Sequence, residues 1–196
     1  PSKCASAQAS AGKWPGTQSR ITPSPCAWQA STNAARSSGA PKRDVGALYE
    51  FFQHLPEASR RFAWDRIGDR AVVERWGVEL DYEKVMPLLA LDGKRIVADA
   101  TLHRREHGPL RLTGRVKWTI DPEFRGVGLG SLLINHFIDT AKGLGLRHLN
   151  CMLITDLEAD AIRVLAELGF RSYEVPGYGT DPDGNQHDMT LMVFKL

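Results

Sequence analysis

Residues 121–133 have the sequence DPEFRGVGLGSLL, in which Gly126, Gly128 and Gly130 alternate with other residues directly after an arginine. Glycine loses more conformational freedom on folding than any other residue, so three glycines in five positions require a reason. A helix that starts here exposes backbone N–H groups and a partial positive charge, which an anion can approach closely over glycine. The cluster therefore predicts either a pyrophosphate-binding loop or a tight turn that needs glycine for its shape alone.

The segments on either side of the glycines predict a strand followed by a helix. Residues 110–120 alternate between apolar and polar side chains well enough to form a long strand. From 130 to 145, apolar residues recur at helical spacing until Gly143 or Gly145 ends the pattern. The loop is therefore expected at the start of an amphipathic helix.

Two familiar phosphate-binding motifs do not fit this loop. The nucleoside-triphosphatase pattern GxxxxGK[ST] needs a lysine after its last glycine, where this chain has Ser131. The dinucleotide pattern GxGxxG follows the first strand of a βαβ unit, whereas here the spacing is GxGxG after a late strand. A phosphate-handling enzyme that uses Mg²⁺ is also unsupported, because the sequence contains no acidic metal cluster.

The remaining patterns from Asp44 onward predict a mixed α/β domain. Asp44 is expected to cap the first helix, and Asp92-Gly93 predicts a hairpin turn. Further segments with periodic apolar residues are expected to be helices over 44–55, from about 57, over 71–80 and over 158–170. Strands are expected over 85–91, 95–103, 148–155, 171–175 and 187–196, with a loop over 176–186. This order indicates a mixed sheet with helices on both faces.

Residues 1–43 differ in composition from the rest of the chain. They are rich in Ser, Ala, Pro and Gly, and they contain no acidic residue but six Lys and Arg. Such a segment cannot bury enough apolar surface to offset its ordering entropy, so we expect it to be disordered. It is either a solvated tail or upstream sequence, or an organelle transit peptide, whose composition is similar. We therefore expect a tail over 1–43 and one domain over 44–196.

Charge and cysteine content exclude several classes of protein. Subtracting the six basic residues of the tail from 25 leaves 19 against 23 acidic residues, so 44–196 has a net charge of −4. This balance argues against a nucleic-acid-binding domain. No run approaches the roughly 18 apolar residues of a membrane-spanning helix. Cys4, Cys26 and Cys151 cannot all pair and lack zinc-binding spacing, which suits a reducing compartment, and we expect a cytoplasmic protein without a metal site.

Together, the glycine loop and a second motif resemble the GNAT superfamily of N-acetyltransferases. DPEFRGVGLGSLL matches the pattern (R/Q)xxGx(G/A) that holds coenzyme A in that superfamily. AIRVLAELGF, over 161–170, resembles the superfamily's helix that closes on Leu-Gly-Phe before a hairpin. The resemblance covers about 44–196 and implies a mainly antiparallel sheet, with helices on both faces and a splayed central pair of strands.

The resemblance implies that acetyl-CoA is the cosubstrate. Its pantetheine arm would lie along the strand at Trp118, Thr119 and Ile120 and would use their backbone groups. Its pyrophosphate would rest on the amides of the loop, beside the charge of Arg125. Those amides belong to Gly126, Val127, Gly128, Leu129, Gly130 and Ser131.

Residues that serve catalysis in many members of the superfamily are replaced in this chain. Leu165 stands where a tyrosine protonates the departing thiolate, and Glu158 stands where an asparagine is usual. Leu153 stands where some relatives have a glutamate that acts as the base. The amine must therefore lose its proton to another residue or to a water chain.

Three residues are candidates for that role. Asp156 and Glu158 follow a strand at its carboxyl end, where ligand sites of α/β proteins gather, although helix capping is the favoured explanation for both. His187 begins the last strand, and an imidazole suits proton transfer near neutral pH. A histidine at the surface end of a hairpin is the structural alternative.

The resulting expectation is an N-acetyltransferase that acts as a monomer or homodimer. A primary amine of a small molecule or peptide would attack the thioester directly, and a backbone N–H near Ile120 would stabilise the oxyanion. The acidic domain favours a cationic acceptor. The alternative, which Leu153 and Leu165 favour, is a non-catalytic module that senses acyl-CoA.

Overall fold

The computed structural model describes residues 7–11, 29–31 and 42–196, and the chain divides into two compact units. The first unit comprises Pro1–Thr101 and Trp118–Arg125, and the second comprises Leu102–Lys117 and Gly126–Leu196. Strands β4 and β5 each begin in one unit and end in the other. Each unit is described below by itself.

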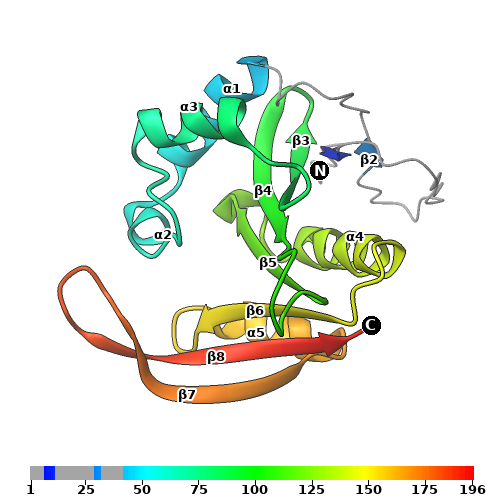
Figure 1. Ribbon diagram of the computed structural model, residues 1–196. Coiled ribbons are helices and arrows are strands. Elements are labelled where there is room, and N and C mark those ends of the chain that lie inside the picture. The colour runs from blue at the N-terminus through cyan, green and yellow to red at the C-terminus, as the bar shows by residue number, and fades with distance from the viewer. Residues whose placement is uncertain (1–6, 12–28, 32–41) are drawn as a thin grey trace. The chain divides into compact units, whose positions relative to one another are not determined.

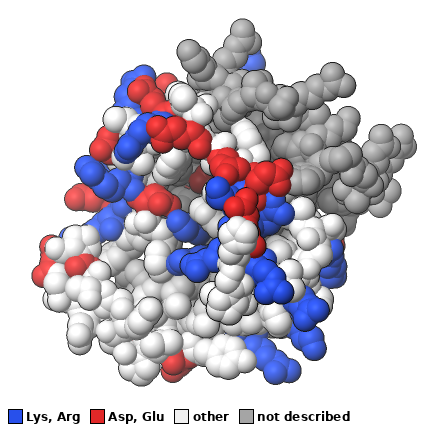
Figure 2. Space-filling view, in the orientation of Figure 1, with Lys and Arg blue, Asp and Glu red and all other residues white. Residues whose placement is uncertain are grey.

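The helices of the first unit form a small hydrophobic core. They are α1 (Lys42–His54), α2 (Glu57–Arg61) and α3 (Arg70–Glu79). Phe51 and Phe52 of α1 are buried, and the ring of Phe52 meets that of Trp76 edge-on with centroids 6.1 Å apart. Because α1 begins at Lys42, Asp44 lies inside the helix and not at the predicted cap. Over these helices, Lys and Arg alternate with Asp and Glu side chains (Figure 2), as in the pair Arg70–Glu74 at 2.8 Å.

The strands of the first unit run β2-β1-β3-β4, followed by the end of β5. β3 (Val85–Asp92) and β4 (Arg95–His103) form the predicted hairpin, whose turn contains Gly93 at φ +62°. Apolar residues are buried on alternate positions of β3, which is the period that places one face of a strand against a core.

Part of the segment for which composition predicts disorder is extended. β1 (Ala7–Ala11) pairs antiparallel with β3, and β2 (Gln29–Ser31) pairs parallel with β1. The prediction of disorder is therefore wrong for these two short strands. The reason is that the open edge of β3 offers backbone N–H and C=O groups, which pair without any need for large apolar side chains. The rest of the tail lies outside the described residues.

The second unit contains a mainly antiparallel sheet. Its full strands are β6 (His148–Ile154), β8 (Gln186–Lys195) and β7 (Arg171–Thr180), in that order, and β7 and β8 form a long hairpin (Figure 1). β6 pairs antiparallel with β8 along its whole length. The sequence places the loop after β7 at 176–186, but β7 continues to Thr180 through an irregularity between Val175 and Gly179. Pro176 has no N–H to donate to a ladder, and such an irregularity accommodates it.

Parallel pairing in the second unit is confined to β5 (Thr113–Ile120) and β6. Their ladder joins Thr113–Arg115 with His148–Asn150 and ends there, although β6 continues to Ile154. The predicted splay of two central strands corresponds to this early end. The strand itself starts three residues later than the pattern over 110–120 predicts, because Thr113 N–H donates to Leu110 C=O in a turn.

Two helices complete the second unit, as the sequence predicts. α4 (Leu129–Gly143) follows the glycine loop, and α5 (Ala159–Glu167) follows β6. α4 contacts α5 and β6, and α5 also contacts β7 and β8. The fold is thus the mixed α/β class expected, with a mainly antiparallel sheet and the β5–β6 pair parallel.

Gly114 of β5 provides a test of packing in the second unit. A Cβ atom there would lie 2.7 Å from Leu102 Cδ1, 2.9 Å from Leu149 Cδ2 and 3.0 Å from Leu146 Cδ1. Because three buried leucines converge on this position, we expect Gly114→Ala to lower the free energy of unfolding by about 1–3 kcal/mol. Urea unfolding measures this loss. The control, Gly143→Ala on α4, has no atom within 4 Å of the new methyl and should leave stability unchanged or slightly higher. Equal stability of the two variants would contradict the packing argument.

Candidate active site

The glycine loop reaches α4 through two residues in the left-handed region. Gly126 has φ +73° and Gly128, the N-cap residue of α4, has φ +84°. Residues with a Cβ atom rarely adopt positive φ angles, so the backbone conformation itself requires glycine at both positions. A Cβ on either glycine would meet no described atom within 4 Å. The space above the loop is therefore open.

The open loop presents a row of unpaired backbone donors. The first N–H groups of a helix have no acceptor inside the helix, and Gly128 has no side chain that could cap them. Within the described residues, no hydrogen bond uses the amides of Gly126 to Ser131. Residues 125–128 are exposed to solvent. These amides and the helix dipole fit an anionic group such as a pyrophosphate.

In the first unit, the residues just before the loop are held by side-chain contacts. Asp121 is buried, accepts from Glu123 N–H at 3.0 Å, and forms an ion pair of 2.6 Å with Arg95 of β4. Arg95 also contacts Glu123 at 3.3 Å, and its guanidinium lies 5.8 Å from the ring centroid of Phe124. These contacts fix the short helix η1 (Pro122–Phe124) that follows β5.

Arg125 is the last residue of the first unit and is anchored to two of its neighbours. Its Nε–H donates to Ile120 C=O at 3.3 Å, and its Nη2 donates to Ser59 Oγ at 3.4 Å. The side chain is exposed. Arg125 therefore holds the strand end and keeps its charge in solvent contact.

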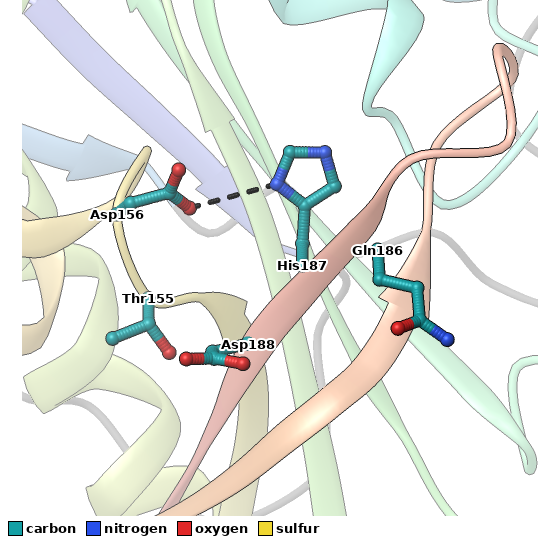
Figure 3. A pocket seen from close by; sticks show the side chains of 5 residues that line it. All are labelled: Thr155, Asp156, Gln186, His187 and Asp188. Carbon is teal, nitrogen blue, oxygen red and sulfur yellow. Dashed lines mark ion pairs between the residues drawn. The ribbon is translucent and has the colours of Figure 1, made fainter.

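A pocket of about 270 Å³ lies in the second unit between the end of β6 and the start of β8. Figure 3 shows Asp156 and His187 facing each other across it. Asp156 Oδ1 and His187 Nδ1 are 3.7 Å apart, so they attract each other when the imidazole is protonated. The lining residues are Thr155, Asp156, Gln186, His187 and Asp188.

The other residues of the pocket are engaged by the strands around it. Thr155 N–H donates to Asp188 C=O at 2.9 Å, and Thr155 Oγ1 lies 2.9 Å from Thr190 Oγ1. Asp188 Oδ1 accepts from Gly177 N–H at 2.7 Å, across the β7–β8 irregularity. Of the lining side chains, Asp156 and His187 are therefore the pair best placed for proton transfer.

The structure separates the three predicted catalytic residues. Asp156 and His187 line one pocket, whereas Glu158 does not line it. Glu158 occupies the N-cap position of α5, but its carboxylate accepts from Ile154 N–H at 2.7 Å and caps no helical amide. Asp156 is not at the cap, so the capping alternative does not apply to it.

The two positions where relatives carry catalytic side chains lie in the hydrophobic interior. Leu153 is 4% exposed and Leu165 is 1% exposed. Cys151, two residues before Leu153, is also buried, and burial together with the charge of Glu158 raises the pKa of its thiol to about 12. On α4, burial lowers the pKa of His136, so this imidazole favours its neutral form. Neither Cys151 nor His136 lines the pocket.

Asp181 is a polar residue near the site that the sequence patterns do not single out. It lies in the β7–β8 turn with its Oδ2 atom 3.5 Å from His187 Nε2. The turn sequence Asp-Pro-Asp-Gly-Asn is typical of an aspartate that binds nearby backbone N–H groups, and this was the available signal.

Comparisons with known proteins place the chain in a family. The model of the acetyltransferase (GNAT) family matches residues 48–170, and the chain belongs to this family of acyltransferases. The comparison with curated proteins gave no match. Within the described residues, no group of three or more His, Cys, Asp or Glu could hold a metal ion, and no helix has the length and apolarity to cross a membrane.

Solved structures of similar fold include three acetyltransferases at low sequence identity. A GNAT acetyltransferase from Streptococcus pneumoniae is 20% identical with a TM-score of 0.66, covering 81% of this chain and 97% of its own. yncA from Salmonella typhimurium, solved with its cofactor acetyl-CoA, is 24% identical with a TM-score of 0.64, covering 81% and 91%. The ribosomal-protein-S5-alanine acetyltransferase from Vibrio fischeri is 19% identical with a TM-score of 0.69, covering 80% and 90%. These likenesses support the fold.

The structural role of Glu158 can be tested by stability. Glu158→Ala removes the acceptor of Ile154 N–H, and we expect it to lower the free energy of unfolding by about 1–2 kcal/mol. Glu158→Gln retains an acceptor oxygen and should recover most of this loss. Asp160→Ala, on the first turn of α5 with a fully exposed side chain, is the control and should have little effect. If Gln were as destabilising as Ala, the hydrogen bond would not be the cause.

Proposed function

We propose that this protein is an acetyl-CoA-dependent N-acetyltransferase that acts on a primary amine. The observation that carries the proposal is the row of unpaired amides at the start of α4, behind an exposed glycine loop, in a chain of the GNAT family. Backbone N–H groups that converge on one open space favour a multiply charged anion such as the diphosphate of coenzyme A.

Because the chain belongs to the GNAT family, we propose acetyl-CoA as its cosubstrate. The amides of Gly126 to Ser131 would bind the diphosphate, and Arg125 would add a positive charge. The backbone of Trp118, Thr119 and Ile120 would bind the pantetheine arm. The structure of yncA with its cofactor acetyl-CoA supports this cosubstrate by analogy of fold.

The proposed reaction is a direct transfer. The amine enters as an ammonium ion and gives one proton to His187, and its lone pair then attacks the thioester carbonyl carbon. The C–N bond forms, the C–S bond breaks with its electron pair leaving on sulfur, and the amine's second proton is released to solvent or to the thiolate. A thiol of pKa about 8.5 is an adequate leaving group without a dedicated acid, so burial of Leu165 at the usual acid position does not prevent turnover.

The side chains that line the pocket support His187 as the base and a cationic amine as the acceptor. Asp156 is 65% exposed, so its carboxylate is available to attract an ammonium group beside the imidazole. Glu158 is a weaker candidate for the base because its carboxylate is already bonded to Ile154 N–H. A general base of this kind contributes about 10²–10⁴-fold to the rate.

A second candidate function is a module that binds acyl-CoA without turnover. The observation that favours it is the burial of leucine at both positions, 153 and 165, where relatives carry a base and an acid. The two functions share the cosubstrate site, so binding alone cannot distinguish them, whereas thiol release can.

The first experiment tests the cosubstrate site. We expect the purified protein to bind acetyl-CoA in isothermal titration calorimetry, and Gly128→Ala to weaken binding about tenfold or more, since each 1.4 kcal/mol corresponds to about tenfold. The new methyl group would enter the open space above the amides. Gly145→Ala is the matched control, because Gly145 also has a left-handed φ of +70° and open surroundings but follows the other end of α4. Equal weakening in both variants, or no binding by the natural chain, would overturn the site.

The second experiment tests turnover. Thiol release from acetyl-CoA is followed with a panel of polyamines, aminoglycosides, amino acids and peptides. We expect release with at least one amine, and His187→Ala should lower kcat about 10²–10⁴-fold while acetyl-CoA affinity is retained. Binding without release on any acceptor would favour the sensor. Unchanged kcat in the His187 variant would exclude His187 as the base.

A further inference from the structure

The turn between β7 and β8 contains a carboxylate that contacts the proposed base. We propose that Asp181 is a positioning residue that fixes the tautomer and orientation of His187, so that the unprotonated Nδ1 atom faces the pocket. This inference rests on the proposed function and adds a residue that the family motifs do not include.

The turn holds the Asp181 carboxylate in one place. Its Oδ1 atom accepts from Asp183 N–H and from Asn185 N–H, both at 2.8 Å. Its Oδ2 atom accepts from Asn185 Nδ2 at 3.0 Å, and Asp181 N–H donates to Asn185 C=O at 2.9 Å. The side chain is 6% exposed. A carboxylate bonded this way cannot turn toward another partner without breaking the turn.

The imidazole of His187 lies between two carboxylates that differ in their surroundings. Nε2 is 3.5 Å from Oδ2 of Asp181, and Nδ1 is 3.7 Å from Oδ1 of Asp156. The ring is 18% exposed. Since Asp181 is buried and fixed while Asp156 is mostly in solvent, the attraction to Asp181 is less screened by water. A neutral imidazole has one N–H, and we infer that it is Nε2–H donating to Asp181.

This tautomer gives the pocket its proton acceptor. With the proton on Nε2, the lone pair of Nδ1 points toward Asp156 and the hollow in which the amine is proposed to bind (Figure 3). When Nδ1 takes a proton from the ammonium ion, the imidazolium that forms lies next to the fixed charge of Asp181. The carboxylate of Asp188, beside His187 in the sequence, accepts from Gly177 N–H at 2.7 Å.

The geometry allows a substitution that changes the contact with the ring and keeps the backbone hydrogen bonds of the turn. In Asp181→Asn, the amide oxygen can keep the Oδ1 bonds to Asp183 and Asn185, while an NH₂ group replaces the oxygen that faces Nε2. The NH₂ group is a donor, so Nε2 must become the acceptor and the proton must move to Nδ1. If the side-chain amide of Asn185 rotates, its oxygen can accept a hydrogen bond from the new NH₂ group at position 181.

The tautomer is read directly by NMR on uniformly ¹⁵N-labelled protein, from the two-bond ¹H–¹⁵N couplings of the imidazole, at rising pH until the spectrum stops changing. We expect the natural chain to give the Nε2–H pattern and Asp181→Asn to give the Nδ1–H pattern. Asp156→Asn and Asn185→Ala are the controls, and both should retain Nε2–H. The Asn185 variant also loses a bond to Oδ2, so it controls for a loosened turn.

Kinetics then test whether the tautomer matters. If an acceptor is found, Asp181→Asn should lower kcat about tenfold or more with a smaller change in KM, whereas Asn185→Ala should leave both near the natural values. An Nδ1–H pattern in the natural chain overturns the inference, even if the variant does not fold. An Asp181→Asn variant that keeps the Nε2–H pattern, or whose kcat is unchanged, also overturns it. The NMR measurement needs neither acetyl-CoA nor an acceptor. Absence of turnover in the natural chain therefore refutes the proposed function separately from the placement of the proton.

Discussion

The N-terminus of α4 imposes the constraint on which the proposed chemistry depends. A helix start in water ordinarily satisfies its first amides with a side-chain cap, and here the N-cap residue is Gly128, which has none. Its φ of +84° favours glycine over residues with a side chain, and within the described residues the amides have no hydrogen-bond partner. The backbone thus gives up capping stability in the free protein, and we propose that it recovers this stability when an anion binds.

The hydrophobic interior of the second unit restricts the positions at which an ionised catalytic base can lie. Burial, together with the charge of Glu158, raises the pKa of the Cys151 thiol to about 12, so this part of β6 disfavours a negative charge. A carboxylate at the neighbouring buried position, Leu153, would face the same penalty. Beyond the end of β6, Asp156 is exposed enough to carry a charge, and there it faces His187 of the paired strand β8.

Much of the fold and the strand–loop–helix geometry of the glycine segment was predictable from sequence, because both depend on local patterns. The glycine spacing, the helical period after Gly130 and the Leu-Gly-Phe ending of α5 each lie within one segment. The meeting of Asp156 with His187 depends on the register that pairs Ile154 with Met189, and no local pattern contains it. Asp181 lies in the turn, within the loop predicted over 176–186, but the extension of β7 past Pro176 to Thr180 depends on an irregularity in the hairpin, which periodicity does not predict.

The proposed anion site and the proposed acceptor pocket differ in what they are built from, so substitutions affect them differently. The anion site uses backbone amides, so its side chains contribute little beyond their effect on φ. The pocket uses side chains, and its shape depends on the β7–β8 turn, where Asp181 binds both the turn amides and the ring of His187. Changes in the hairpin can therefore alter the acceptor and the proton transfer while the cosubstrate site stays intact. If the proposed site is correct, the hairpin is therefore the part of this chain in which acceptor specificity should be sought.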